Sequence, residues 1–175
     1  MALRAASTLA VFALTAAMLS ADESHVQFDP RIDFAAFRTF SFRAQQVDSR
    51  RAELDNPLFL KKLATAIRRA LIGKGLTETN GQPDIVVEFI VTGEEFGDVE
   101  RRLIRRVPGG PVAVRRPVRI TEGTLVIDIF RRGDADPMWR GVYRDDERTG
   151  SKLVNKLPDD ARKLLEKYPR VRRSR

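Results

Sequence analysis

Residues 84–92 constrain the fold more than any other segment, because they form a nearly continuous run of apolar, mostly β-branched residues. The run contains Ile85, Val86, Val87, Phe89, Ile90 and Val91. Such a run is typical of a central strand that is covered on both faces. Apolar and polar residues also alternate in four other segments, residues 25–29, 38–43, 123–130 and 138–144. These patterns predict further strands, so the chain is expected to form a sheet that helices must cover.

Residues 57–72 predict the first covering helix. Asn56 is a good N-cap, and Pro57 stands in the first turn, where its missing N–H costs nothing. A single apolar stripe at helical spacing follows and consists of Leu60, Leu63, Ile67 and Leu71. The opposite face is basic and is expected to contact water; it carries Lys61, Lys62, Arg68 and Arg69. The polar residues 44–55 before this helix predict a loop.

A second helix is predicted to start at Pro158, where Asp159 and Asp160 would be favourable at the positive end of the helix dipole. Its apolar side comprises Ala161, Leu164, Leu165 and Tyr168. The stripe can be extended one or two turns earlier, to Leu153, with a kink at the proline. With the two segments before the first helix counted as one strand region, the order is strand-helix-strand-strand-strand-helix, and it predicts the α+β class and a two-layer α/β sandwich.

Residues 1–21 predict a signal peptide. Arg4 is followed by an uncharged apolar core that is shorter than a membrane span, and small residues precede the polar start at Asp22. We expect cleavage between Ala21 and Asp22 and a soluble periplasmic or secreted protein with no transmembrane span. The alternative is an N-terminal helix that is buried or anchors the protein in a membrane. Residues 22–169 then form a single domain, which must be stable without disulfides because the chain has no cysteine.

The most unusual segment is residues 94–118, here called the basic hairpin. Two β-type arms flank a Pro/Gly turn at residues 108–111, which predicts a projecting hairpin. Arginines are concentrated on its arms and at its end, and they are Arg101, Arg102, Arg105, Arg106, Arg115, Arg116 and Arg119. Guanidinium groups bind phosphates bidentately, which favours an arm that binds anionic lipid or glycan. A solvated insertion without a function remains the alternative, and the basic tail, residues 170–175, adds further positive charge.

Catalytic and metal-binding patterns are weak. His25 is the single histidine, and without cysteine it cannot form a typical zinc site. The acidic pairs 94–95, 145–146 and 159–160 are adjacent along the chain and are not expected to converge. Ser41, Ser49 and Ser151 stand in no recognisable nucleophile motif, and Trp139 is expected to be a core residue. We therefore expect no enzyme activity and no cofactor.

Several motifs resemble a family of small bacterial envelope lipoproteins known only as a domain of unknown function. They are Val26-Gln27-Phe28-Asp29-Pro30, Asp33-Phe34-Ala35-Ala36-Phe37-Arg38-Thr39-Phe40, Lys74-Gly75-Leu76, Asp84-Ile85-Val86-Val87, Glu122-Gly123-Thr124-Leu125-Val126-Ile127-Asp128, Trp139-Arg140-Gly141 and Tyr168-Pro169. The resemblance implies the fold and an envelope location but no reaction. Members usually carry a lipobox cysteine; here Leu19-Ser20-Ala21 is followed by Asp22 instead, which implies a form without the lipid.

Three hypotheses about function follow. The first is a non-enzymatic envelope module, partnered by an anionic lipid or glycan surface or by an envelope protein. The second is a hydrolase that acts on envelope polymers. The third, nucleic-acid binding through the arginines, requires that residues 1–21 are not a signal peptide.

Overall fold

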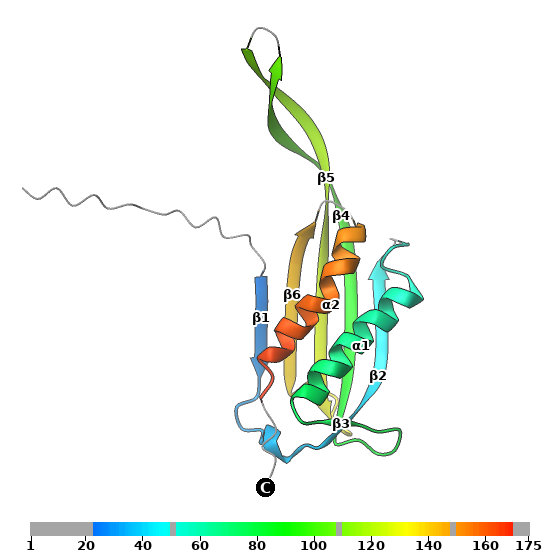
Figure 1. Ribbon diagram of the computed structural model, residues 1–175. Helices are drawn as coiled ribbons and strands as arrows, with labels where there is room; N and C mark the ends of the chain where they lie inside the picture. The colour runs from blue at the N-terminus through cyan, green and yellow to red at the C-terminus, as the bar shows by residue number, and fades with distance from the viewer. Residues whose placement is uncertain (1–22, 50–51, 108–109, 148–149, 170–175) are drawn as a thin grey trace, which may run out of the picture.

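The computed structural model describes residues 23–49, 52–107, 110–147 and 150–169. Figure 1 shows one sheet with two helices in front of it. The elements in chain order are β1 (Glu23–Phe28), the short 3-10 helix η1 (Phe34–Ala36), β2 (Thr39–Ser49), α1 (Pro57–Gly73), β3 (Thr77–Glu78), β4 (Ile85–Val107), β5 (Gly110–Arg131), β6 (Trp139–Glu147) and α2 (Gly150–Glu166). The predicted signal peptide with its cleavage site at Ala21 and Asp22, the turn residues 108–109 and the tail 170–175 lie outside the described residues.

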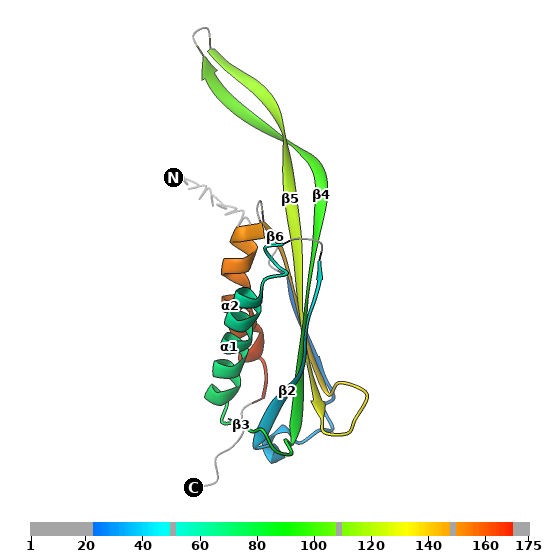
Figure 2. The same cartoon turned by 90° about the vertical axis from the view of Figure 1, so that its right-hand side faces the viewer.

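The six strands are ordered β1-β6-β5-β4-β2-β3. β2 runs parallel to both β3 and β4, and the remaining neighbours are antiparallel. α1 lies in the connection between the parallel strands β2 and β4, which cannot be joined by a tight turn. Both helices pack on the same face of the sheet (Figure 2). The predicted α+β class and two-layer sandwich are therefore confirmed.

One expectation about β4 is wrong, because only one of its faces is covered by helices. Ile85, Val87 and Phe89 point into the core and are buried, whereas Val86 and Ile90 on the other face are half-buried. The continuous apolar run made both faces look buried. Most pairs of this mixed sheet are antiparallel, and an antiparallel sheet can leave its second face partly open. We call this second face, which carries Val86, Ile90, Val126 and Val142, the open face.

α1 follows the sequence pattern closely. The side chain of Asn56 accepts a hydrogen bond from Leu58 N at 2.9 Å, and Pro57 is the first helical residue. Leu63 and Ile67 are fully buried against the sheet as predicted. Phe59 is buried in place of the predicted Leu60, which is half-buried.

α2 starts eight residues earlier than the main prediction, at Gly150, and contains Pro158 in its interior. Asp159 and Asp160 are therefore not at a helix start, and that interpretation is wrong. Asp160 is completely buried and accepts a hydrogen bond from Lys163 Nζ at 3.1 Å. The apolar residues before the proline begin the helix because Leu153 packs directly onto Gly123 of β5, where a Cβ atom would lie 2.3 Å from it.

The core lies between the sheet and the helices and closes around Trp139. Its side chain is fully buried, as predicted, and its ring centroid lies 5.8 Å from that of Tyr168 in an edge-to-face arrangement. Phe34 of η1 contacts the same tyrosine ring at 5.5 Å. The first and last parts of the domain are thereby joined through one aromatic cluster.

The basic hairpin is confirmed as a projecting hairpin, but it is not an insertion between strands. It is the continuation of β4 and β5. These two strands stay paired from Ile85 opposite Arg131 to Val107 opposite Gly110, and the register shifts once, between Phe96 and Val99. β2 stops opposite Gly93 and β6 stops opposite Thr121. Beyond that level β4 and β5 pair only with each other, and they extend well past the body of the domain (Figures 1 and 2). β2 itself reaches Ser49, so part of the predicted loop 44–55 is strand.

Candidate functional site: a basic hairpin and a basic groove

The register of the hairpin brings arginines from its two arms to the same level. Arg101 is opposite Arg116, and Arg102 is opposite Arg115 on the neighbouring rung. Arg105 and Arg106 follow nearer to the turn, opposite Val112 and Pro111. Residues in a strand advance by about 3.4 Å each. The predicted anion-binding residues of the two arms are therefore gathered in one short stretch of ribbon.

The chain enters the domain at the end of the sheet from which the basic hairpin projects. Glu23 is opposite Arg144, which is in turn opposite Thr124 of β5, close to the start of the hairpin. Figures 1 and 2 show that α1 and α2 also begin at this end. Helix N-termini carry a partial positive charge of roughly half a unit each, so the two helix dipoles add partial positive charge at this end.

Acidic residues of three neighbouring strands stand at one level of the sheet near the base of the hairpin, which the sequence did not reveal. Glu94 is opposite Glu122, and Glu122 is opposite Asp146 on the next strand. The strand register thus brings one member of each of two acidic pairs, Glu94 and Asp146, to the same level of the sheet as Glu122. Asp145 beside them is buried and forms an ion pair with Lys156 at 2.8 Å. Within the described residues there is no cluster of three or more side chains suited to hold a metal ion.

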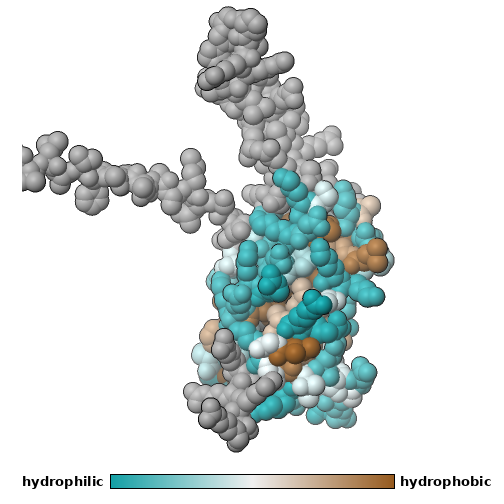
Figure 3. Space-filling view, viewed as in Figure 1, coloured by the Kyte–Doolittle hydropathy of each residue, from teal (hydrophilic) through white to brown (hydrophobic). Residues whose placement is uncertain are grey.

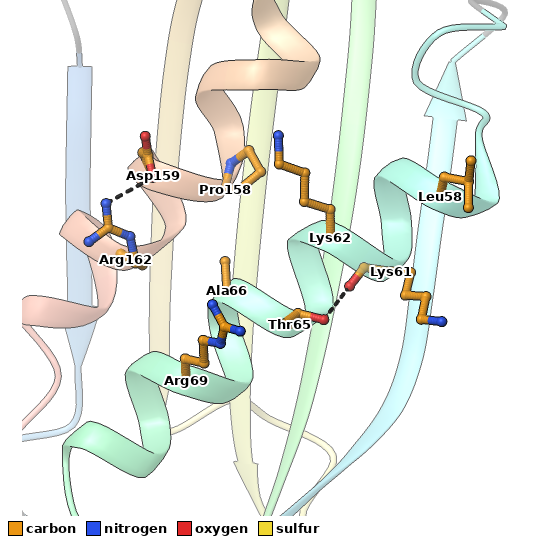
Figure 4. A pocket seen from close by; sticks show the side chains of 9 residues that line it. All are labelled: Leu58, Lys61, Lys62, Thr65, Ala66, Arg69, Pro158, Asp159 and Arg162. Atoms are coloured by element: carbon orange, nitrogen blue, oxygen red, sulfur yellow. Dashed lines mark hydrogen bonds and ion pairs between the residues drawn. The ribbon is translucent and has the colours of Figure 1, made fainter.

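A groove of about 400 Å³ runs between α1 and α2 on the outer side of the helical layer (Figure 4). Its lining is rich in basic side chains and consists of Leu58, Lys61, Lys62, Thr65, Ala66, Arg69, Pro158, Asp159 and Arg162. Figure 3 shows hydrophilic side chains around paler and hydrophobic patches on this face. The sequence predicted a water-facing basic side of α1 but not its position against α2.

The single acid in this lining is already neutralised. Asp159 accepts a hydrogen bond from Arg162 at 2.8 Å, one turn further along α2. This hydrogen bond lowers the pKa of Asp159, and the charges of Arg162, Lys163 and Lys62 lower it further. Arg68, which was also expected to face water, instead pairs with Glu78 through two hydrogen bonds of 2.6 and 3.0 Å and is not part of the groove.

The open face of the sheet carries a row of two ion pairs. Arg140 donates two hydrogen bonds to Asp128, at 2.7 and 2.8 Å, and Arg43 pairs with Glu88. Glu88 and Asp128 are opposite each other in the ladder. The arginine of the second pair also lies 4.5 Å above the ring of Phe130. Both carboxylates are thus held by guanidinium groups, which raises the pKa of Arg140 and of Arg43 through those hydrogen bonds.

The other candidates for chemistry are His25 and Ser49. His25 lies on β1 and lines a pocket of about 390 Å³ with Gln27, Val142 and Arg144, and that lining contains no carboxylate. Ser49 donates a hydrogen bond to the carbonyl of Gly93 at 3.1 Å.

None of the described helices is long and apolar enough to cross a membrane.

The model of one protein family, the domain of unknown function DUF4136, matches residues 24–170. A search of curated proteins finds no match. The chain is similar to a crystal structure of a PDZ domain protein from Parabacteroides distasonis, with 15% identity, a TM-score of 0.58 and coverage of 88% of this chain and 37% of that one. This chain therefore spans little more than a third of that protein, and the likeness bears on the fold alone.

Two further structures have lower scores. A DUF4136 family protein from Bacteroides thetaiotaomicron is 13% identical with a TM-score of 0.47, over 83% of this chain and 92% of that one. A minor lipoprotein from Acinetobacter baumannii is 13% identical with a TM-score of 0.34, over 73% of this chain and 97% of that one.

Proposed function

The chain belongs to the DUF4136 family of domains of unknown function, and we propose that it is an exported, non-enzymatic module that binds an anionic lipid surface of the cell envelope through its basic hairpin. Export rests on the signal-peptide pattern of residues 1–21 and on the family resemblance. The observation that supports surface binding is the ladder register, which gathers arginines from both arms on a ribbon that projects from the domain.

Electrostatics favours contact through the outer part of the hairpin. The guanidinium group of an arginine can donate two parallel hydrogen bonds to the oxygens of one phosphate. Charges on a projecting arm can also approach a surface without desolvating the rest of the domain. The negative charges of Glu94 and Glu122, which face each other at the base, would be repelled by the same surface. The module is therefore expected to contact the membrane with its hairpin, while the body of the domain stays at a distance from the lipid.

The ion pairs of the open face support a non-enzymatic role. A glycosidase needs two carboxyl groups on either side of a cleft, one of them free to donate a proton. Glu88 and Asp128 are neighbours in the ladder, but each is paired with an arginine. Their geometry is that of a structural charge row rather than of an acid and a base facing a substrate.

The binding proposal is tested by co-sedimentation of the protein with vesicles that contain anionic lipid, at low and at high salt. Replacing Arg101, Arg102, Arg105 and Arg106 with serine should strongly reduce sedimentation at low salt. Added salt should have the same effect on the parent protein, because the Debye length falls from about 10 Å at 0.1 M to about 3 Å at 1 M.

The matched control removes four exposed charges elsewhere, by replacing Arg31, Arg131, Arg132 and Lys167 with serine. It should sediment like the parent protein. If the hairpin variant and this control behave alike at every salt concentration, the hairpin does not bind the surface. Vesicles of neutral lipid, and a soluble acidic glycan added as a competitor, separate the lipid surface from other anionic partners.

The export proposal has its own measurement. The intact mass of protein from the extracytoplasmic fraction should correspond to a chain that begins at Asp22, and retention of residues 1–21 would refute cleavage. The variant Asp22→Cys should additionally move the protein to the membrane fraction, because it restores the residue that a lipobox requires.

A further inference from the structure

The groove between α1 and α2 carries positive charge that is not neutralised within the described part of the molecule. Lys62 and Arg69 both face it from α1 and are exposed (Figure 4). Neither has a carboxylate within ion-pair distance among the described residues. The acid of the lining, Asp159, is already paired with Arg162 at 2.8 Å. The groove therefore offers at least two cations to a ligand.

These cations are distributed along the groove and do not converge on one point. Lys62 and Arg69 are seven residues apart on one helix, which corresponds to about 10 Å along its axis. Arg162 stands on the opposite wall, and Lys61 points away from α2 (Figure 4). A single small anion could contact only part of this set at a time. A linear ligand with repeated negative charges could contact several cations at once, and each additional contact would raise its apparent affinity.

The lining also limits which linear polyanion fits. It contains no aromatic side chain, so a single-stranded nucleic acid finds no surface on which its bases can stack. Both walls are helices, whose backbone groups bond within the helix except next to Pro158, so an extended peptide finds few main-chain partners. Its apolar part is confined to Leu58, Ala66 and Pro158 together with the aliphatic stems of the basic residues, which is little for the anchors of an amphipathic helix.

We propose that this groove binds a strand of acidic polysaccharide, with Lys62 and Arg69 contacting successive carboxylate or sulfate groups. The flat surface of Ala66 and Pro158 forms the floor beneath the sugar rings. The hydroxyl of Thr65 donates to the carbonyl of Lys61 at 2.7 Å, so its oxygen remains able to accept a hydrogen bond from a sugar hydroxyl. The site goes beyond the proposed surface binding, because it lies on other elements and uses other residues.

The probe for this site is a short oligogalacturonate, titrated into the full chain at low salt and followed by calorimetry. We expect the double variant Lys62→Ser/Arg69→Ser to bind about tenfold more weakly, a loss of about 1.4 kcal/mol, since exposed ion pairs each contribute little. The control Arg31→Ser/Arg132→Ser removes two exposed charges outside the groove and should bind like the parent protein. Thermal unfolding of all variants checks that they are folded.

Further arms of the titration test the assignment of the ligand and its independence from the hairpin. A neutral oligosaccharide of the same length should give no binding, and inorganic phosphate should bind more weakly than the oligogalacturonate. The quadruple hairpin variant should bind the oligogalacturonate like the parent protein even where it no longer binds vesicles. Equal binding by the groove variant and the parent, absence of binding to the probe, or tighter binding of polyglutamate or oligothymidylate would overturn the proposal.

Discussion

At the scale of single residues, α1 separates burial from charge within one helical turn. Leu63 is fully buried against the sheet, while its neighbour Lys62 is exposed. Leu60, one turn earlier, is only half-buried because Phe59 takes the buried position. The energetic cost of truncation should follow this burial and not the sequence pattern, in which both leucines belong to the same stripe.

We therefore predict that Leu63→Ala lowers the free energy of unfolding by about 2–5 kcal/mol, as expected for a packed core position. Leu60→Ala should cost clearly less, and Lys62→Ala should stay within about 0.5 kcal/mol of the parent protein. Chemical denaturation of the three variants gives these values. Equal losses for the two leucines would contradict the orientation of α1 in the structure.

At the scale of elements, one carboxylate ties the start of β2 to the start of β4. Asp84 accepts hydrogen bonds from the backbone N–H groups of Arg38 and Thr39 at 2.8 and 2.9 Å, and its own N–H donates to Thr39 Oγ1 at 2.9 Å. The hydrogen bond from Arg38 is the main reason why the pKa of Asp84 is lowered, and Thr39 and the charge of Arg132 add to it, against the effect of burial. This contact aligns two parallel strands that no short turn connects.

A lowered pKa in the folded state means that Asp84 stabilises the fold above the pKa of an unfolded aspartate, about 3.9, and that this contribution is lost as the pH falls through the folded-state value. Asp84→Asn should reduce stability at pH 7 by about 1–2 kcal/mol, the usual effect of weakening a charge-assisted hydrogen bond. It should also make stability less dependent on pH in the acid range, below about pH 5. The control Asp136→Asn, in an exposed turn, should change neither value, and the same acid dependence in all three proteins would refute this role.

The elements differ in how far the sequence determines them. The start and the main buried residues of α1 could be predicted because its cap, its first proline and most of its stripe are local signals. The start of α2 was misplaced because Pro158 mimics a first turn, while the real start is decided by the packing of Leu153 onto Gly123 across the sheet. The parallel pairing of β2 with β4 and the facing acids Glu94 and Glu122 depend on strand register, which arises only when distant segments meet.

The same distinction holds for the candidate sites. The basic hairpin was visible in the sequence because its arginines and its Pro/Gly turn are contiguous. The groove was not, because Lys62 and Arg69 come from one helix and Pro158 and Arg162 from another. Three of its nine lining residues, Lys61, Lys62 and Arg69, could be recognised beforehand, as part of the basic side of α1.

At the scale of the whole molecule, the two ends of the domain differ. The basic hairpin, the entry of the chain at Glu23 and the first turns of both helices lie at one end (Figure 1). The turn that contains Gln82, between β3 and β4, lies at the opposite end of the sheet. If surface binding occurs through the hairpin, the molecule should approach a membrane in one orientation only.

That orientation can be measured because the chain has no native cysteine, so a single introduced thiol can carry an environment-sensitive dye. The dye on Ala113→Cys, within the hairpin, should change its emission when anionic vesicles are added at low salt and should revert at high salt. The dye on Gln82→Cys should not respond to the same vesicles. A response at residue 82 that equals or exceeds the response at residue 113, or no response at either position while the protein is bound, would contradict binding through the hairpin.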